Sequence, residues 1–221
     1  MQLDRKGECH VFVPFIAVEG PIGVGKTTLT TAIAETFSYQ QLREISGENP
    51  FLDQFYKDKE KWSFQTEMFF LCNRYEQLKQ INKEYISAGT AVVADYHIFK
   101  NILFAQRTLE ATDFVKYKEI YRILTAGLPM PNIIISLSAT LPTLQQRIDK
   151  RGRPYEADMD PDYLLQLSAD YQCYIPEFEL AHPEIPVIHI NGDQMDFVHN
   201  PADMNIILKQ VREAVQKGFE A

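Results

Sequence analysis

The sequence Gly20-Pro21-Ile22-Gly23-Val24-Gly25-Lys26-Thr27 matches the pattern of a phosphate-binding loop (P-loop) at every fixed position. It follows an apolar run, 11–18, that is typical of a buried strand. It precedes a segment in which Leu29, Ile33 and Phe37 recur at four-residue steps, as on one face of a helix. A strand, a glycine-rich loop and a helix in this order predict a nucleotide-binding protein with a parallel sheet.

The chemistry of the loop follows from its glycines, which let successive backbone N–H groups face a polyphosphate at the positive end of the helix. Lys26 is expected to reach the β and γ phosphates, and the Thr27 hydroxyl to bind Mg²⁺. We therefore expect ATP to lie against Gly20, Pro21, Ile22, Gly23, Val24, Gly25, Lys26, Thr27 and Thr28. The P-loop alone does not name the acceptor of the phosphate.

Further apolar runs predict the rest of the sheet, because they are continuous rather than alternating, as in strands covered on both faces. These runs are Ala91–Ala94, Asn132–Leu137 and Val187–Ile190, and a fifth, weaker strand is expected at Gln41–Ile45. Helical spacing lies between them, and Leu141-Pro142 opens one such helix. The prediction is a three-layer α/β P-loop kinase fold, a single domain over 1–221 with a parallel sheet of about five strands. Ligands are expected at the carboxyl ends of its strands.

The overall composition excludes several classes of protein. A net charge of −8 argues against a nucleic-acid partner. No run approaches the roughly 18 apolar residues of a membrane helix. Residues 1–10 lack the features of a signal or transit peptide. The cysteines, Cys9, Cys72 and Cys173, have neither zinc-ligand spacing nor disulfide density, which indicates reduced thiols and a cytoplasmic protein.

Several further segments come into register with one known family. They are Glu44 with Asn49-Pro50, Tyr56, Trp62-Ser63-Phe64-Gln65-Thr66-Glu67, Arg74, Asp95 and 147–156 with its core Arg151-Gly152-Arg153. In order and spacing, from about Phe15 to Phe197, the chain resembles the deoxynucleoside kinases, and most closely their bacterial purine-type branch. The resemblance implies that ATP and Mg²⁺ phosphorylate the 5′-hydroxyl of a deoxynucleoside, and that the enzyme is a homodimer.

The resemblance also assigns roles to acids at the ends of predicted strands. Phosphoryl transfer to a hydroxyl needs a carboxylate that accepts the proton and a metal that bridges the phosphates. By resemblance, Glu44 is the base near the 5′-hydroxyl and Asp95 is a partner of Mg²⁺, although Asp95 could share the proton-accepting role. Tyr56 and Glu156 match the pair that holds the 3′-hydroxyl of the sugar. On residue pattern alone, an acid that ends a strand can also be merely solvated.

A basic cluster stands out against the acidic whole, with Arg147, Lys150, Arg151 and Arg153 inside seven positions. Gly152 should end the helix between two arginines and leave their guanidinium groups on a mobile turn. Such a lid can close over a triphosphate and neutralise the charge of the transferring phosphoryl group. By resemblance Arg151 and Arg153 contact phosphate, and Arg147 lies against the donor base, near 191–197. Solvated basic residues at a helix end are the alternative.

The predicted helix from Trp62 to Tyr75 is apolar nearly all round, which predicts a buried helix. Glu67 and Arg74 are therefore unexpected in it, since unpaired buried charges are costly. Seven residues apart, they share a face and lie about 10 Å apart along the axis. This separation is too long for a simple ion pair and suits the two ends of one flat ligand. Two charges that emerge at a surface seam are the other possibility.

By resemblance both side chains line the base pocket, and hydrogen-bond chemistry then selects the base. Arginine pairs with the acceptors O6 and N7 of guanine, and a carboxylate suits its donors at N1–H and N2–H₂. Adenine would be mismatched at both ends. Deoxyguanosine is therefore the expected substrate, with dGMP and ADP as products. A deoxyadenosine or broad purine kinase, a nucleoside monophosphate kinase and a nucleotide-binding switch or ATPase stay open as alternatives.

The chain departs from the family pattern at two places. Most members follow the strand-end acid with Arg-Ser, whereas this chain has Tyr96-His97 after Asp95, which puts a family contact to the 5′-oxygen and phosphates in doubt. We assign no catalytic role to His97. Where relatives carry an acid that holds the pocket arginine, this chain has Asn101, which can still accept one bond from Arg74.

Overall fold

The computed structural model describes residues 12–44, 48–156 and 159–220, and at its centre lies one parallel sheet of five strands. The strands are β1 (Phe15–Glu19), β2 (Gln40–Leu42), β3 (Val92–Ala94), β4 (Ile133–Ser138) and β5 (Val187–Asn191). Their order in the sheet is β2-β3-β1-β4-β5, and every pairing is parallel. The predicted α/β class and the size of the sheet are confirmed.

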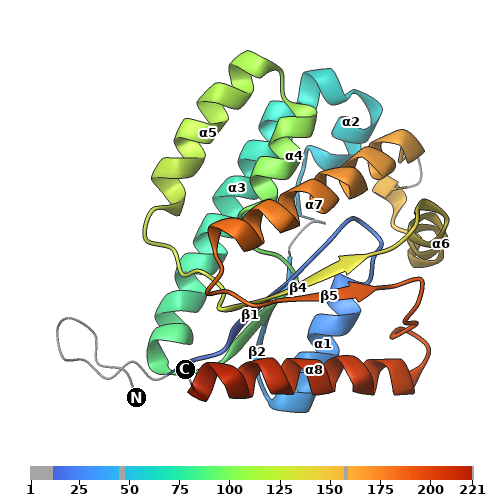
Figure 1. Ribbon diagram of the computed structural model, residues 1–221. Helices are drawn as coiled ribbons and strands as arrows, with labels where there is room; N and C mark the ends of the chain where they lie inside the picture. The colour runs from blue at the N-terminus through green and yellow to red at the C-terminus, as the bar shows by residue number, and fades with distance from the viewer. Residues whose placement is uncertain (1–11, 45–47, 157–158, 221) are drawn as a thin grey trace.

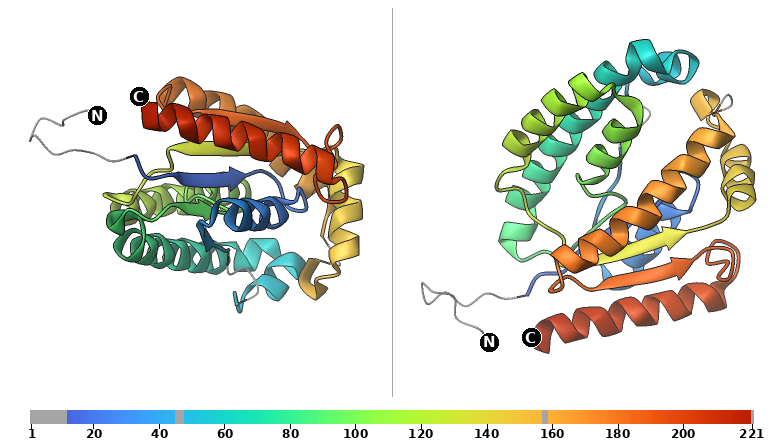
Figure 2. Two further views of the ribbon diagram at one scale, coloured as in Figure 1. Left: turned by 90° about the horizontal axis from the view of Figure 1, so that it is seen from below. Right: turned by 45° about the horizontal axis from the view of Figure 1, so that its top comes forward.

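Helices cover both faces of this sheet and make three layers (Figures 1 and 2). Those long enough to pack on the sheet or on each other are α1 (Lys26–Phe37), α2 (Leu52–Lys57), α3 (Lys59–Glu84), α4 (Lys100–Thr108), α5 (Ala111–Thr125), α6 (Leu141–Arg151), α7 (Pro161–Ala181) and α8 (Pro201–Glu220). Short 3₁₀ turns occupy Ile86–Ala88 and Pro154–Glu156. Helices α1 and α8 lie on one face, and α3, α4, α5 and α7 lie on the other.

The continuous apolar strands divide their side chains between the two faces, because successive residues of a strand point in opposite directions. In β1, Ile16 and Val18 join a core cluster with α1 and α8. Phe15 points the other way, into a cluster with α3 and α5. In β4, Ile134 packs against α7. Both faces are thus apolar, which explains why the strands show no polar alternation.

The predicted strand boundaries differ from the observed ones by a few residues. The first strand begins at Phe15 rather than in the region of Val11, which lies outside the described residues. Pro14 has no N–H to donate to a ladder. On the β4 side the Asn132 side chain binds this segment, since its Oδ1 accepts from the Phe15 N–H at 2.9 Å and its Nδ2 donates to the Val13 carbonyl at 2.6 Å. On the β3 side the Pro14 carbonyl accepts from the Val92 N–H at 2.8 Å. The predicted second strand reached Ile45, which is also outside the described residues.

The register of the strands brings the catalytic candidates to one edge. Ala94 of β3 lies opposite Ala17 of β1 and Leu42 of β2. The residues that follow these strands, namely the P-loop, Asp95 and Glu44, are consequently neighbours at the carboxyl edge.

Helix α3 is buried along one face only, so the prediction of a helix buried all round is wrong. Ser63, Thr66, Glu67, Leu71, Arg74, Leu78 and Ile81 are buried, whereas Gln65 and Cys72 are exposed. The apolar side chains Phe64, Met68 and Phe69 are half-buried at its edges. Polar and charged residues therefore share the buried face of the helix with Leu71, Leu78 and Ile81, and apolar residues form part of its outer surface.

The remaining sequence features concern membranes and thiols. Among the helices of the described residues, none combines the length and the apolar character that a membrane span needs. Cys72 and Cys173 are free thiols on the surface. Cys9 and the rest of 1–10 lie outside the described residues.

Gly20 is the position where a side chain should be least tolerated. Its φ is +145°, and a Cβ atom there would overlap the carbonyl oxygen of Leu137. We expect Gly20→Ala to lower the free energy of unfolding by about 3 kcal/mol, from backbone strain and steric overlap together. Gly127→Ala is a matched control, because its φ is also positive (+80°) but nothing lies within 4 Å. Equal losses for both variants in urea denaturation would contradict the overlap.

Candidate active site

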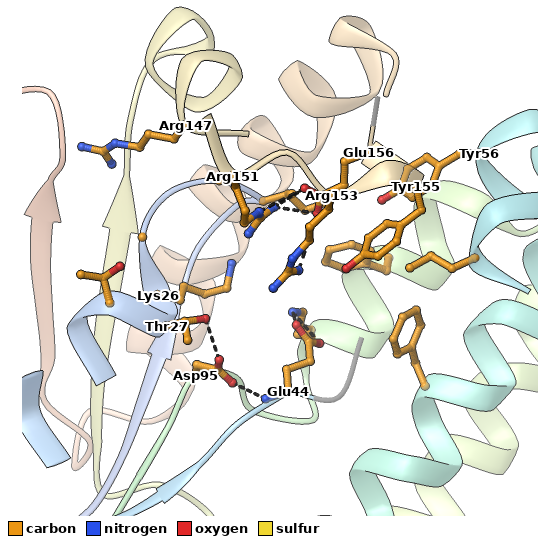
Figure 3. A pocket seen from close by; sticks show the side chains of 18 of the residues that line it. Lys26, Thr27, Glu44, Tyr56, Asp95, Arg147, Arg151, Arg153, Tyr155 and Glu156 are labelled. Carbon is orange, nitrogen blue, oxygen red and sulfur yellow. Dashed lines mark hydrogen bonds and ion pairs between the residues drawn. The ribbon is translucent and has the colours of Figure 1, made fainter. Parts of the chain in front are cut away.

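A cavity of about 440 Å³ opens at the carboxyl edge of the sheet, between the P-loop and α3. That volume is within the range of small-molecule sites. Its walls come from the P-loop, α2, α3, α4, α6 and the segment that precedes α7 (Figure 3). Among the predicted site residues, those that line it are Ile22, Gly23, Gly25, Lys26, Thr27, Thr28, Glu44, Tyr56, Glu67, Arg74, Asp95, Arg147, Arg151, Arg153 and Glu156. Asn101 is fully buried behind this wall.

The side chain of Lys26 folds back onto the backbone of the P-loop. Gly25 precedes α1 in the left-handed conformation (φ +105°), which a glycine adopts without strain. Lys26 Nζ donates to the carbonyl oxygens of Gly20 and Pro21, each at 2.8 Å. Burial, followed by repulsion from Lys100, lowers the pKa of Lys26 to about 7. An anion in the loop would offset both effects and keep this ammonium charged.

A chain of hydrogen bonds joins the P-loop to the two strand-end acids. Thr27 Oγ1 donates to Asp95 Oδ2 at 2.9 Å, and the Glu44 N–H donates to Asp95 Oδ1 at 2.6 Å. Burial, together with the charge of Glu44, raises the pKa of Asp95. A hydroxyl beside a carboxylate is an all-oxygen donor set that suits Mg²⁺, which typically takes only one or two protein ligands beside phosphate and water. The residues present therefore fit this ion.

Glu44 is held by two cations. Lys100 Nζ lies 3.0 Å from both of its carboxylate oxygens. Arg74 Nη2 donates to Glu44 Oε1. Burial would raise the pKa of Glu44, but Lys100, Arg74 and Lys26 outweigh it and hold this pKa well below its usual range. The carboxylate is consequently ionised across the neutral range.

The basic cluster is positioned as a lid over the P-loop. Helix α6 ends at Arg151, and Gly152 follows in the left-handed conformation (φ +64°). Arg151 binds both oxygens of the buried Glu156, at 2.6 to 3.1 Å, and Arg153 Nη1 lies 3.7 Å from Glu156 Oε1. In Figure 3 the Arg153 side chain points down toward Lys26 and Glu44.

Arg147 points away from these arginines, toward the other side of the P-loop (Figure 3). Its guanidinium donates to the carbonyl oxygens of Val24 at 2.8 Å and Gly192 at 3.0 Å, and it lies 5.8 Å from the centroid of the Phe197 ring. Arg147 thus joins the P-loop to the 191–197 segment.

The far end of the cavity is apolar except for two charged residues of α3. Its apolar walls are Leu52, Phe55, Phe70, Phe104 and Tyr163. Glu67 Oε1 accepts from Thr108 Oγ1 at 3.0 Å, but the buried Oε2 has no partner among the described residues. Burial raises the pKa of Glu67 to about 7. A buried acceptor without a partner is costly unless a ligand supplies the donor.

Arg74 also has a buried hydrogen-bond donor without a partner among the described residues. Its Nη1 donates to Asn101 Oδ1 at 2.7 Å, and Asn101 in turn donates to the Tyr117 hydroxyl at 2.9 Å. The expected bond from Arg74 to Asn101 is therefore present. The buried Arg74 Nε has no partner among the described residues. A guanidinium has more N–H donors than the two that Asn101 and Glu44 occupy, so Arg74 can still donate to a ligand.

Sequence reasoning missed several residues of this site. Lys100 has the most consequential contacts, and His199 lines the donor side beside Lys150 of the predicted basic cluster. Lys100 lies among apolar residues, in His97-Ile98-Phe99-Lys100, and this same signal drew attention to Glu67 and Arg74. His97 is buried between Phe15 and Phe99, and burial lowers the pKa of its imidazole to about 4. It is a neutral packing residue.

A P-loop after the first strand, acids at two adjacent strand ends and a basic lid together define a P-loop phosphotransferase with an enclosed acceptor pocket. The chain belongs to the deoxynucleoside kinase family, whose model matches residues 16–216. Kinases of this family transfer a phosphate from ATP to a deoxynucleoside.

Individual relatives agree with this membership. The chain is 49% identical to a deoxyguanosine kinase of Bacillus subtilis over 91% of its length and 98% of that protein. It is 28% identical to a deoxyadenosine/deoxycytidine kinase of the same organism, over 90% and 92% of the two chains. The deoxyadenosine kinase of M. mycoides, solved with bound dATP, has the same fold, with a TM-score of 0.77 and 23% identity over 90% of this chain and 99% of that one.

Proposed function

We propose that this enzyme transfers the γ-phosphoryl group of ATP to the 5′-hydroxyl of deoxyguanosine and yields dGMP and ADP. One observation carries the choice of base. At the apolar end of the cavity, a buried carboxylate oxygen of Glu67 and a buried N–H of Arg74 lack partners among the described residues. The 49% identity to a protein named deoxyguanosine kinase supports the same substrate.

Guanine offers the complementary groups. Its N1–H and N2–H₂ donors suit the free oxygen of Glu67, and its O6 and N7 acceptors suit the remaining donors of Arg74. The rings of Phe70 and Phe104 give the base apolar walls. Adenine would face Glu67 with a lone pair and Arg74 with an amino group, and both protein groups would stay unpaired. Sites of this kind discriminate by roughly 10⁴ or more.

On the acceptor side, we assign proton acceptance to Glu44. The 5′-hydroxyl gives its proton to the ionised carboxylate, its oxygen forms the new bond to the γ-phosphorus, and the bond from that phosphorus to the β–γ bridging oxygen breaks. ADP leaves with the electron pair of that bond, and Glu44 later releases the proton to water. Tyr56 and Glu156, which both line the cavity, would hold the 3′-hydroxyl of the sugar.

On the donor side, P-loop residues 20–28 would bind the phosphates, with Lys26, Arg151 and Arg153 neutralising charge on the transferring group. Arg147 would lie against the adenine. Thr27 and Asp95 would hold Mg²⁺, which would supply positive charge against the charge that develops on the phosphate oxygens. Arg151 can leave Glu156 for phosphate as the lid closes.

We further propose that residues 1–221 act as one domain, and that the enzyme works in the cytoplasm, where ATP is available, as a homodimer. Exposed apolar side chains on α5 support an association surface, since Val115 and Ile123 are 54% and 66% exposed. Light scattering coupled to size exclusion tests the dimer directly.

An ATP-coupled assay tests the function and its alternatives together. Acceptors should include the four deoxynucleosides, guanosine and dGMP. We expect deoxyguanosine to have the highest kcat/KM. Equal rates with deoxyadenosine would indicate a broad purine kinase, and preference for dGMP would indicate a monophosphate kinase. ADP release without any acceptor would indicate an ATPase.

The raised pKa of Glu67 makes the base preference depend on pH. Above its pKa of about 7 the carboxylate is ionised and accepts from guanine, and below it the carboxyl is protonated and can donate to adenine instead. We expect the ratio of kcat/KM for deoxyguanosine to that for deoxyadenosine to rise from about pH 6 to about pH 8. Taking the ratio cancels titrations on the ATP side, including that of Lys26. A ratio independent of pH would contradict the recognition of guanine by an ionised Glu67.

A further inference from the structure

Lys100 is a buried cation that has no role in the assignments above. It is the first residue of α4 and only 3% exposed, yet it reaches the cavity. Its ammonium lies 3.0 Å from each carboxylate oxygen of Glu44, and 5.3 Å from the centroid of the Phe104 ring. Burying an ammonium is costly unless it is paired, and the carboxylate of Glu44 is the partner that forms an ion pair with Lys100.

The hydrogen bonds of Glu44 distinguish its two oxygens. Oε1 accepts from both Arg74 and Lys100, which occupies the two lone-pair directions of a carboxylate oxygen. Oε2 accepts from Lys100 alone among the described residues. Oε2 is therefore the oxygen with a lone pair left for the proton of the acceptor hydroxyl. The two contacts of Lys100 also fix the plane of the carboxylate.

The residue directly after Asp95 cannot bind the Glu44 carboxylate in this way. Tyr96 is fully buried, and its hydroxyl donates to Gln77 Oε1 at 2.5 Å on α3. The segment from Tyr96 to Phe99 packs into the core, and α4 begins with Lys100 pointing back at Glu44. The cation that binds Glu44 thus comes from the start of α4 rather than from the residue that follows Asp95 at the end of β3.

Lys100 also belongs to a wider group of charges. Besides Glu44, its charge influences Glu19, Lys26, Glu67 and Asp95. Glu44 in turn faces Lys26 from α1, Arg74 from α3, Lys100 from α4 and Asp95 from the end of β3. Glu19 is fully buried and binds the His97 N–H and the Tyr171 hydroxyl, so it is engaged elsewhere.

We propose that Lys100 is the positioning residue of the proton acceptor. It holds the Glu44 carboxylate by both oxygens and directs the Oε2 lone pair toward the 5′-hydroxyl. The proposal rests on the proposed function, in which Glu44 accepts that proton.

A double-mutant cycle tests it, with Lys100→Met, Glu44→Gln and the double variant assayed with deoxyguanosine and ATP. Because Lys100 acts through Glu44, we expect Lys100→Met alone to lower kcat about 100-fold, as for a misplaced catalytic group. In the Glu44→Gln background the same change should cost less than about threefold. Equal losses in both backgrounds would overturn the proposal. The single Glu44→Gln variant reports separately on the proposed function, since a normal kcat there removes Glu44 from its role.

A comparison of kcat with KM supplies a readout that a merely structural lysine would not move. Because Lys100 contacts Glu44 rather than the base contacts Glu67 and Arg74, kcat should fall in Lys100→Met while KM for deoxyguanosine changes by less than about threefold. Lys209→Met is the matched control, because Lys209 is 78% exposed on α8. A higher KM with an unchanged kcat in Lys100→Met would also overturn the proposal. If Lys100→Met does not fold, Lys100→Gln keeps a neutral donor of similar length, and the same cycle and comparison apply to it.

Discussion

Glu67→Gln is expected to shift the base preference from deoxyguanosine toward deoxyadenosine, by at least about 100-fold in the ratio of their kcat/KM values. The amide keeps the volume of the carboxylate but can donate. Its NH₂ group suits the N1 lone pair of adenine, and it opposes the N1–H of guanine. A buried polar group left unpaired costs about 1 to 3 kcal/mol, and guanine would lose one such pairing while adenine gains one.

The measurement is the pair of kcat/KM values at saturating ATP, for the variant and for the unaltered enzyme. Glu76→Gln is the control, because it is the same substitution at a position outside the cavity. Glu76 lies on the same helix, and its side chain is 67% exposed. An unchanged ratio in Glu67→Gln would defeat the pocket as described. A fall for both substrates without a shift would indicate that Glu67 supports the structure of the pocket, through Thr108, rather than the base.

The sequence allowed the residues that line this site to be predicted better than the contacts between them. The P-loop and the apolar runs have strong local patterns, and parallel strands place their carboxyl ends at one edge. The positions of Glu44, Asp95 and the lid followed from this rule and from family resemblance. Glu67 and Arg74 stood out because a charged side chain in a buried apolar helix is costly unless it has a partner.

The contacts that were not foreseen are those between distant segments. Arg74 binds Glu44, which lies 30 residues earlier, and Lys100 binds Glu44 from 56 residues later. No spacing rule connects these residues, because the fold alone brings α3, α4 and the end of β2 together. The exposed outer surface of α3 was also missed, since its half-buried phenylalanines look like core residues in a sequence.

These contacts set charges of opposite sign against one another in the cavity. Lys26, Arg74 and Lys100 face Glu44 and Asp95, with Glu67 nearby at a pKa of about 7. A polyphosphate adds negative charge at the end where Lys26 and the lid arginines lie, and this should draw the lid arginines away from Glu156. At the acceptor end, the opposite charges of Glu44 and Lys100 compensate each other, whether or not the donor nucleotide is bound.

Glu44→Gln is expected to lower kcat by about 10² to 10⁴, the range for a group that accepts a proton in the transition state. The amide occupies the same space but cannot take the proton of the 5′-hydroxyl at neutral pH. Deoxyguanosine should still bind, because the base contacts come from Glu67 and Arg74, and Arg74 keeps its bond to Asn101 when Glu44 becomes an amide. Single-turnover rates give the chemical step, and calorimetric titration with deoxyguanosine gives the affinity.

Some loss of stability should accompany this change, since Arg74 and Lys100 keep their charges while the carboxylate between them becomes neutral. Thermal unfolding with and without ligand separates that effect from catalysis. Glu48→Gln, in the same segment but exposed, is the control. Glu44→Asp sharpens the test, because it keeps a base but withdraws it by one methylene, so it should recover part of the turnover that glutamine loses. A normal kcat in a folded Glu44→Gln enzyme would assign proton acceptance to Asp95 instead, the one other carboxylate that the described structure places beside both the P-loop and Glu44.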